Sequence, residues 1–293
     1  MEAILMKTWF ITGATGGLAT SVMRKLLENG DRVAATTRHA GALADLKAQY
    51  GDQLWESTMN LKDEQDVLLV VDQAFAELGT IDVLLNNAGY GLYGTVEGIS
   101  AKQTEDVFAV NLFGSLNTAR AFLPHFRKQG HGQIVQIASM AGQYSTQAMG
   151  MYSASKWAVE AAFEAMAQEV ASFNIQTTIV EPGGIRTNFV GGNGAFGEDI
   201  KAYEGTQVDQ ITRQIKGDIP GVDVADLIKM IAGDPDKMAQ QIIERVEAGH
   251  GPLRMTLGSD AYNKIHAALA ERLEALEAQK DLAYKTDAAD YQG

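Results

Sequence analysis

Short runs of β-branched and aromatic residues alternate with helical patterns along most of the sequence, and this alternation limits the folds open to the chain. The predicted strands are 8–12, 32–37, 54–59, 81–87, 132–139, 175–181 and, as an edge strand, 252–258. The predicted helices are one ending near Leu27 and those at 42–50, 64–78, 101–128, 152–173, 222–248 and 259–280. Strands joined through helices run parallel and are covered on both faces. The pattern therefore predicts an α/β fold, a doubly wound Rossmann-type sheet of about seven strands with a C-terminal helical extension.

No repeat or linker divides the 293 residues, so we expect a single domain, 1–293. Its first part, to about residue 140, is expected to bind a cofactor, and about 140–293 to hold the catalytic and substrate half. After Pro182 the segment 183–205 is rich in glycine and has no clear period, which is typical of functional or mobile loops. We expect a substrate loop at about 188–220.

Composition excludes several classes of function. With 37 acidic and 24 basic side chains the net charge is −13, which disfavours nucleic acid as a partner. The chain has no cysteine, so disulfides, thiol nucleophiles and thiolate metal sites are excluded. Five scattered histidines show no metal-ligand spacing, and we expect no metal. No signal peptide or membrane-spanning run is recognisable, which favours a cytoplasmic protein without a membrane partner.

The loop TGATGGLA (12–19) connects the first predicted strand to the first predicted helix. Gly13 permits a sharp turn, while Gly16 and Gly17 let a ligand approach the backbone. The free N–H groups of the following helix attract an anion. The position favours dinucleotide binding over a simple tight turn, although the spacing is not G-x-G-x-x-G.

The end of the second predicted strand bears on the choice of dinucleotide. An NAD site normally has an acidic residue here, whereas an arginine suits the 2′-phosphate of NADP. Thr37 and Arg38 stand at this position, and no carboxylate lies between Asp31 and Asp45. NADP(H) is therefore favoured over NAD(H), with a merely solvated arginine as the alternative.

Tyr152 and Lys156 lie four residues apart at the start of an otherwise apolar helix, so both side chains lie on one face. Alone, the pair is a weak signal and favours an amphipathic helix whose polar tips reach water. The rest of the sequence decides between these interpretations.

Together, these features resemble the short-chain dehydrogenase/reductase family. The resemblance extends from about Lys7 to Thr187. Within the family, the sequence is most similar to the branch that includes the hydroxysteroid and retinol enzymes and related carbonyl reductases. The matching motifs are TGATGG (12–17), NNAG (86–89), VN (110–111), Ser139, YSASK (152–156) and PGGIRT (182–187).

The resemblance implies an oxidoreductase that interconverts a ketone or aldehyde and an alcohol. Tyr152 is then the general acid or base, and a nearby ammonium, Lys156, is expected to lower its pKa. Ser139 would hold the substrate oxygen. Asn111 is implied to organise a water relay to the lysine, or is a buried helix asparagine.

The resemblance also implies the cofactor-binding residues. They are Gly13, Thr15, Gly16, Gly17, Leu18, Thr37, Arg38, Asn60, Leu61, Asn87, Ala88, Gly89, Val110, Tyr152, Lys156, Pro182, Gly183, Ile185 and Thr187. Two residues depart from the family pattern. Ala19 replaces a common glycine, and Asn60 replaces an aspartate that binds the adenine amino group. We expect Asn60 to weaken the adenine preference without abolishing it, because an amide carbonyl is still an acceptor.

The substrate is expected to be a lipophilic small molecule. The segments 143–151 and 190–205 are predicted to line its pocket with Tyr144, Met149, Met151, Phe189 and Phe196, although each is equally suited to the core. The family resemblance also implies a homo-oligomer, dimer or tetramer, formed through helices 101–128 and 152–173. Two other functions remain open: an NADP-binding sensor without turnover, and a nucleotide-sugar epimerase or dehydratase.

Overall fold

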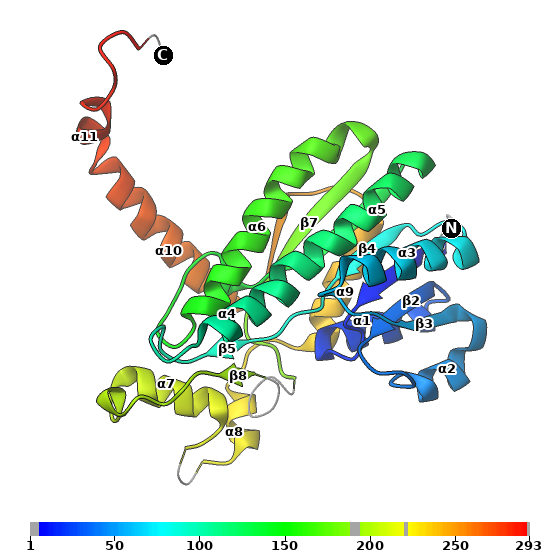
Figure 1. Ribbon diagram of the computed structural model, residues 1–293, viewed down its shortest axis with the longest axis horizontal. Coiled ribbons are helices and arrows are strands. Elements are labelled where there is room, and N and C mark those ends of the chain that lie inside the picture. The colour runs from blue at the N-terminus through cyan, green and yellow to red at the C-terminus, as the bar shows by residue number, and fades with distance from the viewer. Residues whose placement is uncertain (1–5, 188–193, 220–221, 292–293) are drawn as a thin grey trace.

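The computed structural model describes residues 6–187, 194–219 and 222–291. Its centre is a parallel sheet with the strand order β3-β2-β1-β4-β6-β7-β9 (Figure 1). These strands are β1 (Thr8–Thr12), β2 (Arg32–Thr37), β3 (Leu54–Thr58), β4 (Val83–Asn86), β6 (Gly132–Ile137), β7 (Ile175–Pro182) and β9 (Arg254–Leu257). Trp9 of β1 pairs with Val33 on one side and Val83 on the other. The predicted sheet of about seven strands is confirmed.

Helices cover both faces of this sheet, as the sequence predicts. The helices that lie before α7 are α1 (Gly17–Glu28), α2 (Ala44–Tyr50), α3 (Glu64–Leu78), α4 (Ala101–Phe108), α5 (Ser115–Gln129) and α6 (Gly150–Val170). Those that follow are α7 (Gln207–Lys216), α8 (Val224–Lys229), α9 (Pro235–Ala248), α10 (Ser259–Glu277) and α11 (Lys280–Tyr284). On one face, Val22 of α1 and Ile242 of α9 join the core. On the other, Val71, Phe122 and Phe163 do so, from α3, α5 and α6.

The direction of the strand order reverses at β1, since β2 and β3 lie on one side of it and β4 on the other. The loops after β1 and β4 therefore diverge at the same edge of the sheet. In parallel α/β sheets ligands bind at this switch point, outside the carboxyl ends of the strands. The fold thus brings the glycine loop after Thr12 next to the NNAG segment that begins at Asn86.

The predicted helix 101–128 is interrupted. A π-helical turn, Ala109–Gly114, separates α4 from α5. Such a turn is common at functional sites. The apolar face of the helix continues through this single wider turn, so the spacing of apolar residues does not reveal it.

The segment after β7 contains more regular structure than its sequence indicates. A short strand β8 (Ala195–Phe196) pairs with β5 (Leu92–Tyr93), and α7 follows at Gln207–Lys216. The predicted helix 222–248 is divided into α8 and α9, because the chain between them turns to pair Gly233 with Ile185. Asp234 then caps α9, its carboxylate accepting from the backbone N–H groups of Asp236 and Lys237.

The C-terminal helices project from the body (Figure 1). Ala261 and Ile265 are the buried residues of α10, and every described residue from Leu269 to Tyr291 is exposed. The predicted C-terminal helical extension is confirmed. Within the described residues, no helix is long and apolar enough to cross a membrane.

Candidate active site

The glycine loop after β1 leaves the first turn of α1 open. Gly13 has φ +63°, and a Cβ there would lie 2.9 Å from the Cα of Ala88. Gly16 precedes α1, whose N-terminus has no side-chain cap and no acidic residue in its first turn. The free N–H groups at this end are suited to bind phosphate. Thr15 is exposed on the loop and Leu18 is buried below it.

The segment after β4 is fixed to the same loop. The amide of Asn87 donates to the carbonyl oxygens of Thr12 and Gly13 at 3.2 and 3.1 Å. The backbone N–H groups of Asn87 and Ala88 both donate to the Thr12 hydroxyl at 3.1 Å. A Cβ on Gly89 would lie 3.1 Å from Oδ1 of Asn111, so this glycine provides space beside that side chain.

The residues predicted to contact the adenosine part of a dinucleotide lie at the ends of β2 and β3. Arg38 is exposed, close enough to Tyr90 to affect the pKa of that phenol. Thr37 donates its hydroxyl to the carbonyl of His39 at 2.8 Å. Asn60 is exposed after β3, and its Oδ1 already accepts from the N–H of Lys62 at 3.2 Å. Leu61 packs against Gly114 of the π-helical turn.

Ala19, which replaces a glycine common in the family, fits the packing of α1 against the sheet. Its side chain is fully buried in the core cluster that covers the α1 face of the sheet. The extra methyl group is therefore accommodated in helix–sheet packing.

Ser139 and Tyr152 come together at the end of β6. Ser139 lies two residues beyond the strand, and its hydroxyl accepts from the N–H of Ala141 at 3.1 Å. A hydrogen bond with the Tyr152 phenol, which lies on the first turn of α6, lowers the pKa of that phenol and opposes the larger effect of burial. Both side chains are nearly buried, at 9% and 8% exposure. A carbonyl oxygen placed between the two hydroxyls would meet two hydrogen-bond donors.

Lys156 lies one helical turn after Tyr152. Its ammonium donates to the carbonyl of Ile137 at 3.1 Å and lies 5.9 Å from the centre of the Tyr152 ring. Burial lowers the pKa of Lys156 to about 8, although the nearby Glu160 carboxylate opposes this effect.

Asn111 lies in the π-helical turn and is held at both ends of its amide. Its Oδ1 accepts from the N–H of Tyr90, and its Nδ2 donates to the Tyr90 carbonyl and the Ser155 hydroxyl, all at 3.0 Å. The Ser155 hydroxyl in turn donates to the Tyr152 carbonyl at 2.7 Å. Asn111 is thus tied to α6 beside the tyrosine and lysine. Val110 precedes it, half-buried.

The expectation that Lys156 lowers the pKa of Tyr152 is not met in this structure. Burial raises the pKa of the Tyr152 phenol, and only its hydrogen bond from Ser139 acts in the opposite direction. The physical reason is burial of both groups: with a pKa of about 8, Lys156 has lost its charge at the higher pH at which the phenol, raised above 10, ionises.

The segment Pro182–Thr187 closes over the glycine loop. A Cβ on Gly17 would come within 2.3 Å of Cγ2 of Thr187, so glycine is needed where the two segments meet. Ile185 pairs with Gly233, which fixes the segment to the chain before α9.

Asp260, which sequence reasoning missed, also holds this segment. Its carboxylate accepts from the N–H of Gly184 at 2.8 Å, and a Cβ on Gly183 would collide with it. The residue lies 76 positions away on the first turn of α10, and no local pattern links it to β7.

A second missed feature lies one turn beyond Lys156. Buried Glu160 of α6 and buried Glu181 of β7 share Arg254 of β9, at 3.4 and 3.3 Å. Arg254 also pairs with the half-buried Glu164 at 2.9 Å, and the amide of Gln143 donates to Glu160. Burial, followed by the charge of Glu181, raises the pKa of Glu160 to about 7.

In the described part of the chain, no group of three or more histidine, aspartate or glutamate side chains is arranged to hold a metal.

Aromatic side chains lie beside the Tyr152 phenol. The ring of Tyr93 is 6.1 Å from that of Tyr152 and 5.6 Å from that of Phe196. Met151 packs with Leu92 and Ile99 in a small apolar cluster. Tyr144 and Met149 are half-buried, and Phe189 lies outside the described residues.

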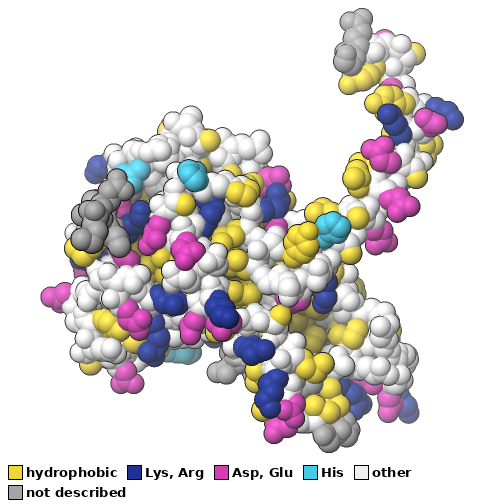
Figure 2. All heavy atoms as spheres, turned by 180° about the vertical axis from the view of Figure 1, so that it is seen from behind, with side chains coloured by type: hydrophobic (Ala, Val, Ile, Leu, Met, Phe, Trp, Pro, Cys, Tyr) yellow, Lys and Arg dark blue, Asp and Glu magenta, His cyan; other side chains and the backbone are white. Residues whose placement is uncertain are grey.

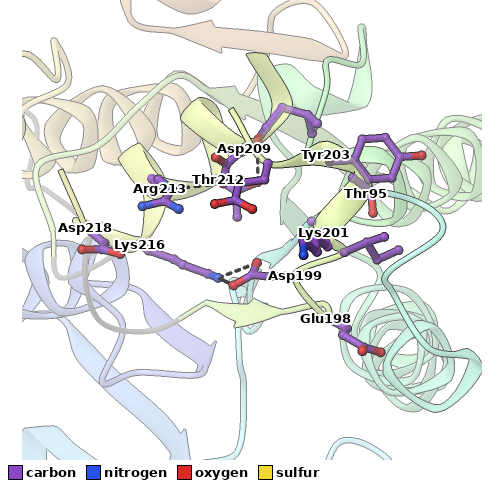
Figure 3. Close-up of a pocket in the computed structure, with 14 residues that line it drawn as sticks. Thr95, Glu198, Asp199, Lys201, Tyr203, Asp209, Thr212, Arg213, Lys216 and Asp218 are labelled. Atoms are coloured by element: carbon purple, nitrogen blue, oxygen red, sulfur yellow. Dashed lines mark hydrogen bonds and ion pairs between the residues drawn. The ribbon is translucent and has the colours of Figure 1, made fainter. Parts of the chain in front are cut away.

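A separate cavity of about 290 Å³ lies between α7 and the loop 198–204 (Figure 3). Its walls carry charges that pair with one another, Lys216 with Asp199 at 2.7 Å and Arg213 with Asp209 at 3.1 Å. Ser139, Tyr152 and Lys156 are not among the residues that line it.

Comparison with known proteins identifies the family. The family model described as short chain dehydrogenase matches residues 7–196. The chain belongs to the short-chain dehydrogenase family. It is therefore an oxidoreductase of the NAD(P)-dependent dehydrogenase/reductase type.

Relatives of similar length support this assignment. Oxidoreductase BOA17 of Botryotinia fuckeliana is 32% identical over 272 residues, which cover 88% of this chain and 90% of the relative. Human retinol dehydrogenase 8 is 30% identical, with 85% of this chain and 80% of that protein covered. The crystal structure of a short-chain dehydrogenase from Streptomyces avermitilis superposes with a TM-score of 0.86. It is 33% identical, over 96% of this chain and all of that one.

The residues of this short-chain dehydrogenase fit a nicotinamide dinucleotide. Gly16 lacks a side chain beside the uncapped start of α1, which leaves room for a pyrophosphate. Arg38 and Thr37 would hold the adenosine end. Lys156, whose ammonium is 5.9 Å from the Tyr152 ring centre, and the Pro182–Thr187 segment would hold the nicotinamide end.

The Glu160 cluster generates a prediction for Glu160→Gln. Because the folded protein holds a proton at Glu160 between pH 4.5 and about 7 and the unfolded chain does not, wild-type stability falls as pH rises through this range. The free energy of unfolding of the variant should therefore increase relative to wild type from about pH 5 to about pH 7, measured by urea denaturation.

Glu164→Gln is the matched control. Arg254 lowers the pKa of Glu164, so removal of this carboxyl should produce no relative gain over the same pH range. Equal pH slopes for the two variants would contradict the assignment of the raised pKa to Glu160.

Proposed function

We propose that the protein is an NADP-dependent reductase or dehydrogenase that interconverts a lipophilic ketone or aldehyde and its alcohol. The observation that carries this proposal is the contact between two nearly buried hydroxyl groups, Ser139 and Tyr152, one helical turn from a buried ammonium. A bound nicotinamide would supply or accept the hydride at the substrate carbon. The protein residues must then orient the substrate oxygen and handle its proton.

Ser139 is proposed to fix the substrate oxygen. Its oxygen accepts from the N–H of Ala141, its hydroxyl hydrogen remains available to a neighbouring acceptor, and the Tyr152 phenol is its hydrogen-bond neighbour. A substrate carbonyl that takes this place would accept from both hydroxyls. Such donors stabilise negative charge as it develops on the oxygen.

Tyr152 is proposed to give this oxygen its proton during reduction and to remove it during oxidation. Lys156, whose ammonium lies 5.9 Å from the Tyr152 ring centre, is proposed to hold the cofactor ribose and to favour the phenolate. Asn111 would anchor the water relay to the lysine, because its amide is fixed beside Tyr90 and Ser155.

NADP is preferred in this proposal because Arg38 is exposed at the end of β2 and no carboxylate stands there. A guanidinium forms strong paired hydrogen bonds with a phosphate. An exposed arginine therefore favours the dinucleotide that carries the additional 2′-phosphate.

The substrate class follows from the side chains around Tyr152. Tyr93, Met151 and Phe196 present aromatic and thioether groups on this side of the site. The name of the human relative, a retinol dehydrogenase, agrees with a lipophilic substrate. We further propose one domain over 1–293, a cytoplasmic location and a homo-oligomer, dimer or tetramer.

Tyr152→Phe should lower kcat/KM for carbonyl reduction by about 10²–10⁴-fold, because the proton donor is removed while the ring remains. NADPH consumption with a panel of lipophilic ketones and aldehydes measures this. NADPH binding, followed by protein fluorescence, should be retained. Tyr262→Phe, on an exposed part of α10, is the control.

Full activity of Tyr152→Phe would contradict the proposed role. If the wild-type protein binds NADPH but reduces no member of the panel, the sensor function replaces this proposal.

Arg38→Leu should raise KM for NADPH by about 10-fold or more and leave KM for NADH unchanged, since charge-assisted hydrogen bonds contribute about 1.5–3 kcal/mol. Arg24→Leu, an exposed arginine of α1, should change neither value. An equal loss with both cofactors, or a wild-type preference for NADH, would remove the role given to Arg38.

A further inference from the structure

One tight turn connects the candidate substrate-binding serine to the residues that pack on α6. A 3₁₀ turn begins directly after Ser139. The N–H groups of Ala141 and Gly142 donate to the Ser139 hydroxyl and carbonyl, at 3.1 and 2.8 Å. The N–H of Gln143 donates to the Met140 carbonyl at 3.0 Å and completes the turn. Because these hydrogen bonds join consecutive residues, the position of Gln143 affects where the Ser139 hydroxyl lies.

The far end of this turn is fixed to α6 by a buried carboxylate. The side-chain amide of Gln143 donates to Glu160, which is 2% exposed. Glu160 is itself held by Arg254 of β9 at 3.4 Å. Gly142 packs so closely that a Cβ in its place would collide with the Glu160 carboxylate. Glu160 lies about two helical turns after Tyr152, so the turn is anchored to the helix that carries the proposed proton donor.

The C-terminal helix holds the same glutamine from another direction. The later part of α10 projects from the body as an arm (Figure 2). Arg272 of this helix donates to the Gln143 carbonyl at 2.8 Å, and its guanidinium lies 5.0 Å from the ring centre of Trp157. Gln143 is therefore held through its side chain by α6 and through its backbone by α10.

Stability alone does not account for the buried carboxylate that Gln143 contacts. Glu160 and the equally buried Glu181 share one arginine, Arg254. In the described part of the chain, Oε1 of Glu160 has no hydrogen-bond partner. Removing carboxylates from water is costly, and buried ion pairs often add little to the free energy of folding. The carboxylate does provide a fixed acceptor for the Gln143 amide, which favours a role in geometry.

We propose that Gln143 is a positioning residue, whose hydrogen bond to Glu160 fixes the turn that orients the Ser139 hydroxyl toward the substrate oxygen. Gln143 does not contact the reacting atoms and acts through Ser139, so the inference rests on the proposed function. Donors stabilise the developing charge on a substrate oxygen only at the correct distance. A misplacement of about 1 Å can lower the rate by about 10²-fold.

Gln143→Met keeps the size of the side chain and removes its donor. It should lower kcat for carbonyl reduction about 10-fold, and leave KM for NADPH and NADPH binding, followed by protein fluorescence, unchanged. The matched control is Gln73→Met, because Gln73 of α3 also donates to a glutamate, Glu77, at 2.8 Å on an exposed surface. The control should leave kcat unchanged. Unchanged kcat in Gln143→Met would overturn the inference.

A double-mutant cycle shows whether the effect passes through the serine. Gln143→Met added to Ser139→Ala should lower kcat no further than Ser139→Ala alone, because no hydroxyl remains to be oriented. A second loss of about 10-fold in the double variant would show a general structural effect and overturn the inference. If Ser139→Ala lowers kcat and Gln143→Met does not, only this inference fails. A wild-type protein without carbonyl reduction would refute the proposed function and, with it, the role given to Gln143.

Amide hydrogen exchange tests the same contact without turnover. The N–H groups of Ala141 and Gly142 both donate to Ser139, so their exchange, followed by NMR, reports how firmly the turn is held. Gln143→Met should speed their exchange about 10-fold, whereas Gln73→Met should not. Unchanged exchange in Gln143→Met would show that the glutamine does not hold the turn. That result would overturn the inference even if the protein reduces carbonyl compounds.

Discussion

The hydrogen bond from the buried Lys156 ammonium to the Ile137 carbonyl joins the start of α6 to the carboxyl edge of the sheet, where the candidate catalytic residues lie. Ile137 is the last residue of β6, so this one contact connects the helix to the carboxyl edge of a central strand. Tyr152 lies one turn before the lysine, and Ser139 follows two residues after Ile137. This contact therefore links the helix that carries the phenol to the strand that the serine follows.

Burial of a cation is electrostatically unfavourable, and a neighbouring carboxylate partly offsets this cost. Burial lowers the pKa of Lys156, while Glu160 on the next turn opposes that change. Glu160 is itself buried beside Glu181, and Arg254 stabilises both carboxylates. Gly142 must be a glycine because a Cβ would lie 2.0 Å from Oε1 of Glu160. The helix that carries the candidate catalytic pair is thus held by contacts with Ile137 of β6 and Arg254 of β9, and its Glu160 lies beside the charge of Glu181 of β7.

Much of this arrangement can be predicted from the sequence, for a physical reason. Alternating strands and helices restrict the topology to a parallel sheet, and a parallel sheet brings its strand ends to one edge. The glycine loop, Asn87 and Ser139 follow strands in the sequence, so their proximity follows from the fold. Tyr152 and Lys156 share a helix face through their spacing alone.

Other features arise from contacts that no local pattern records. Asp260 reaches Gly184 from a helix 76 positions later, and Arg254 meets Glu160 from 94 positions away. The π-helical turn at Asn111 leaves the apolar spacing of its neighbours intact, and α7 is short and polar. The pKa values of Tyr152 and Lys156 depend on how deeply each side chain is buried, which spacing along a helix does not specify.

The most direct test of the account is the titration of Lys156 itself, followed by NMR in protein labelled with ¹³C at the lysine ε-carbon and assigned with Lys156→Arg. We expect a pKa of about 8, because burial disfavours the charged ammonium more than the Glu160 carboxylate favours it. A value at the ordinary 10.5 would show that the ammonium is solvated. The contact that places Tyr152 beside Ser139 would then be absent in solution, and the central claim would fail.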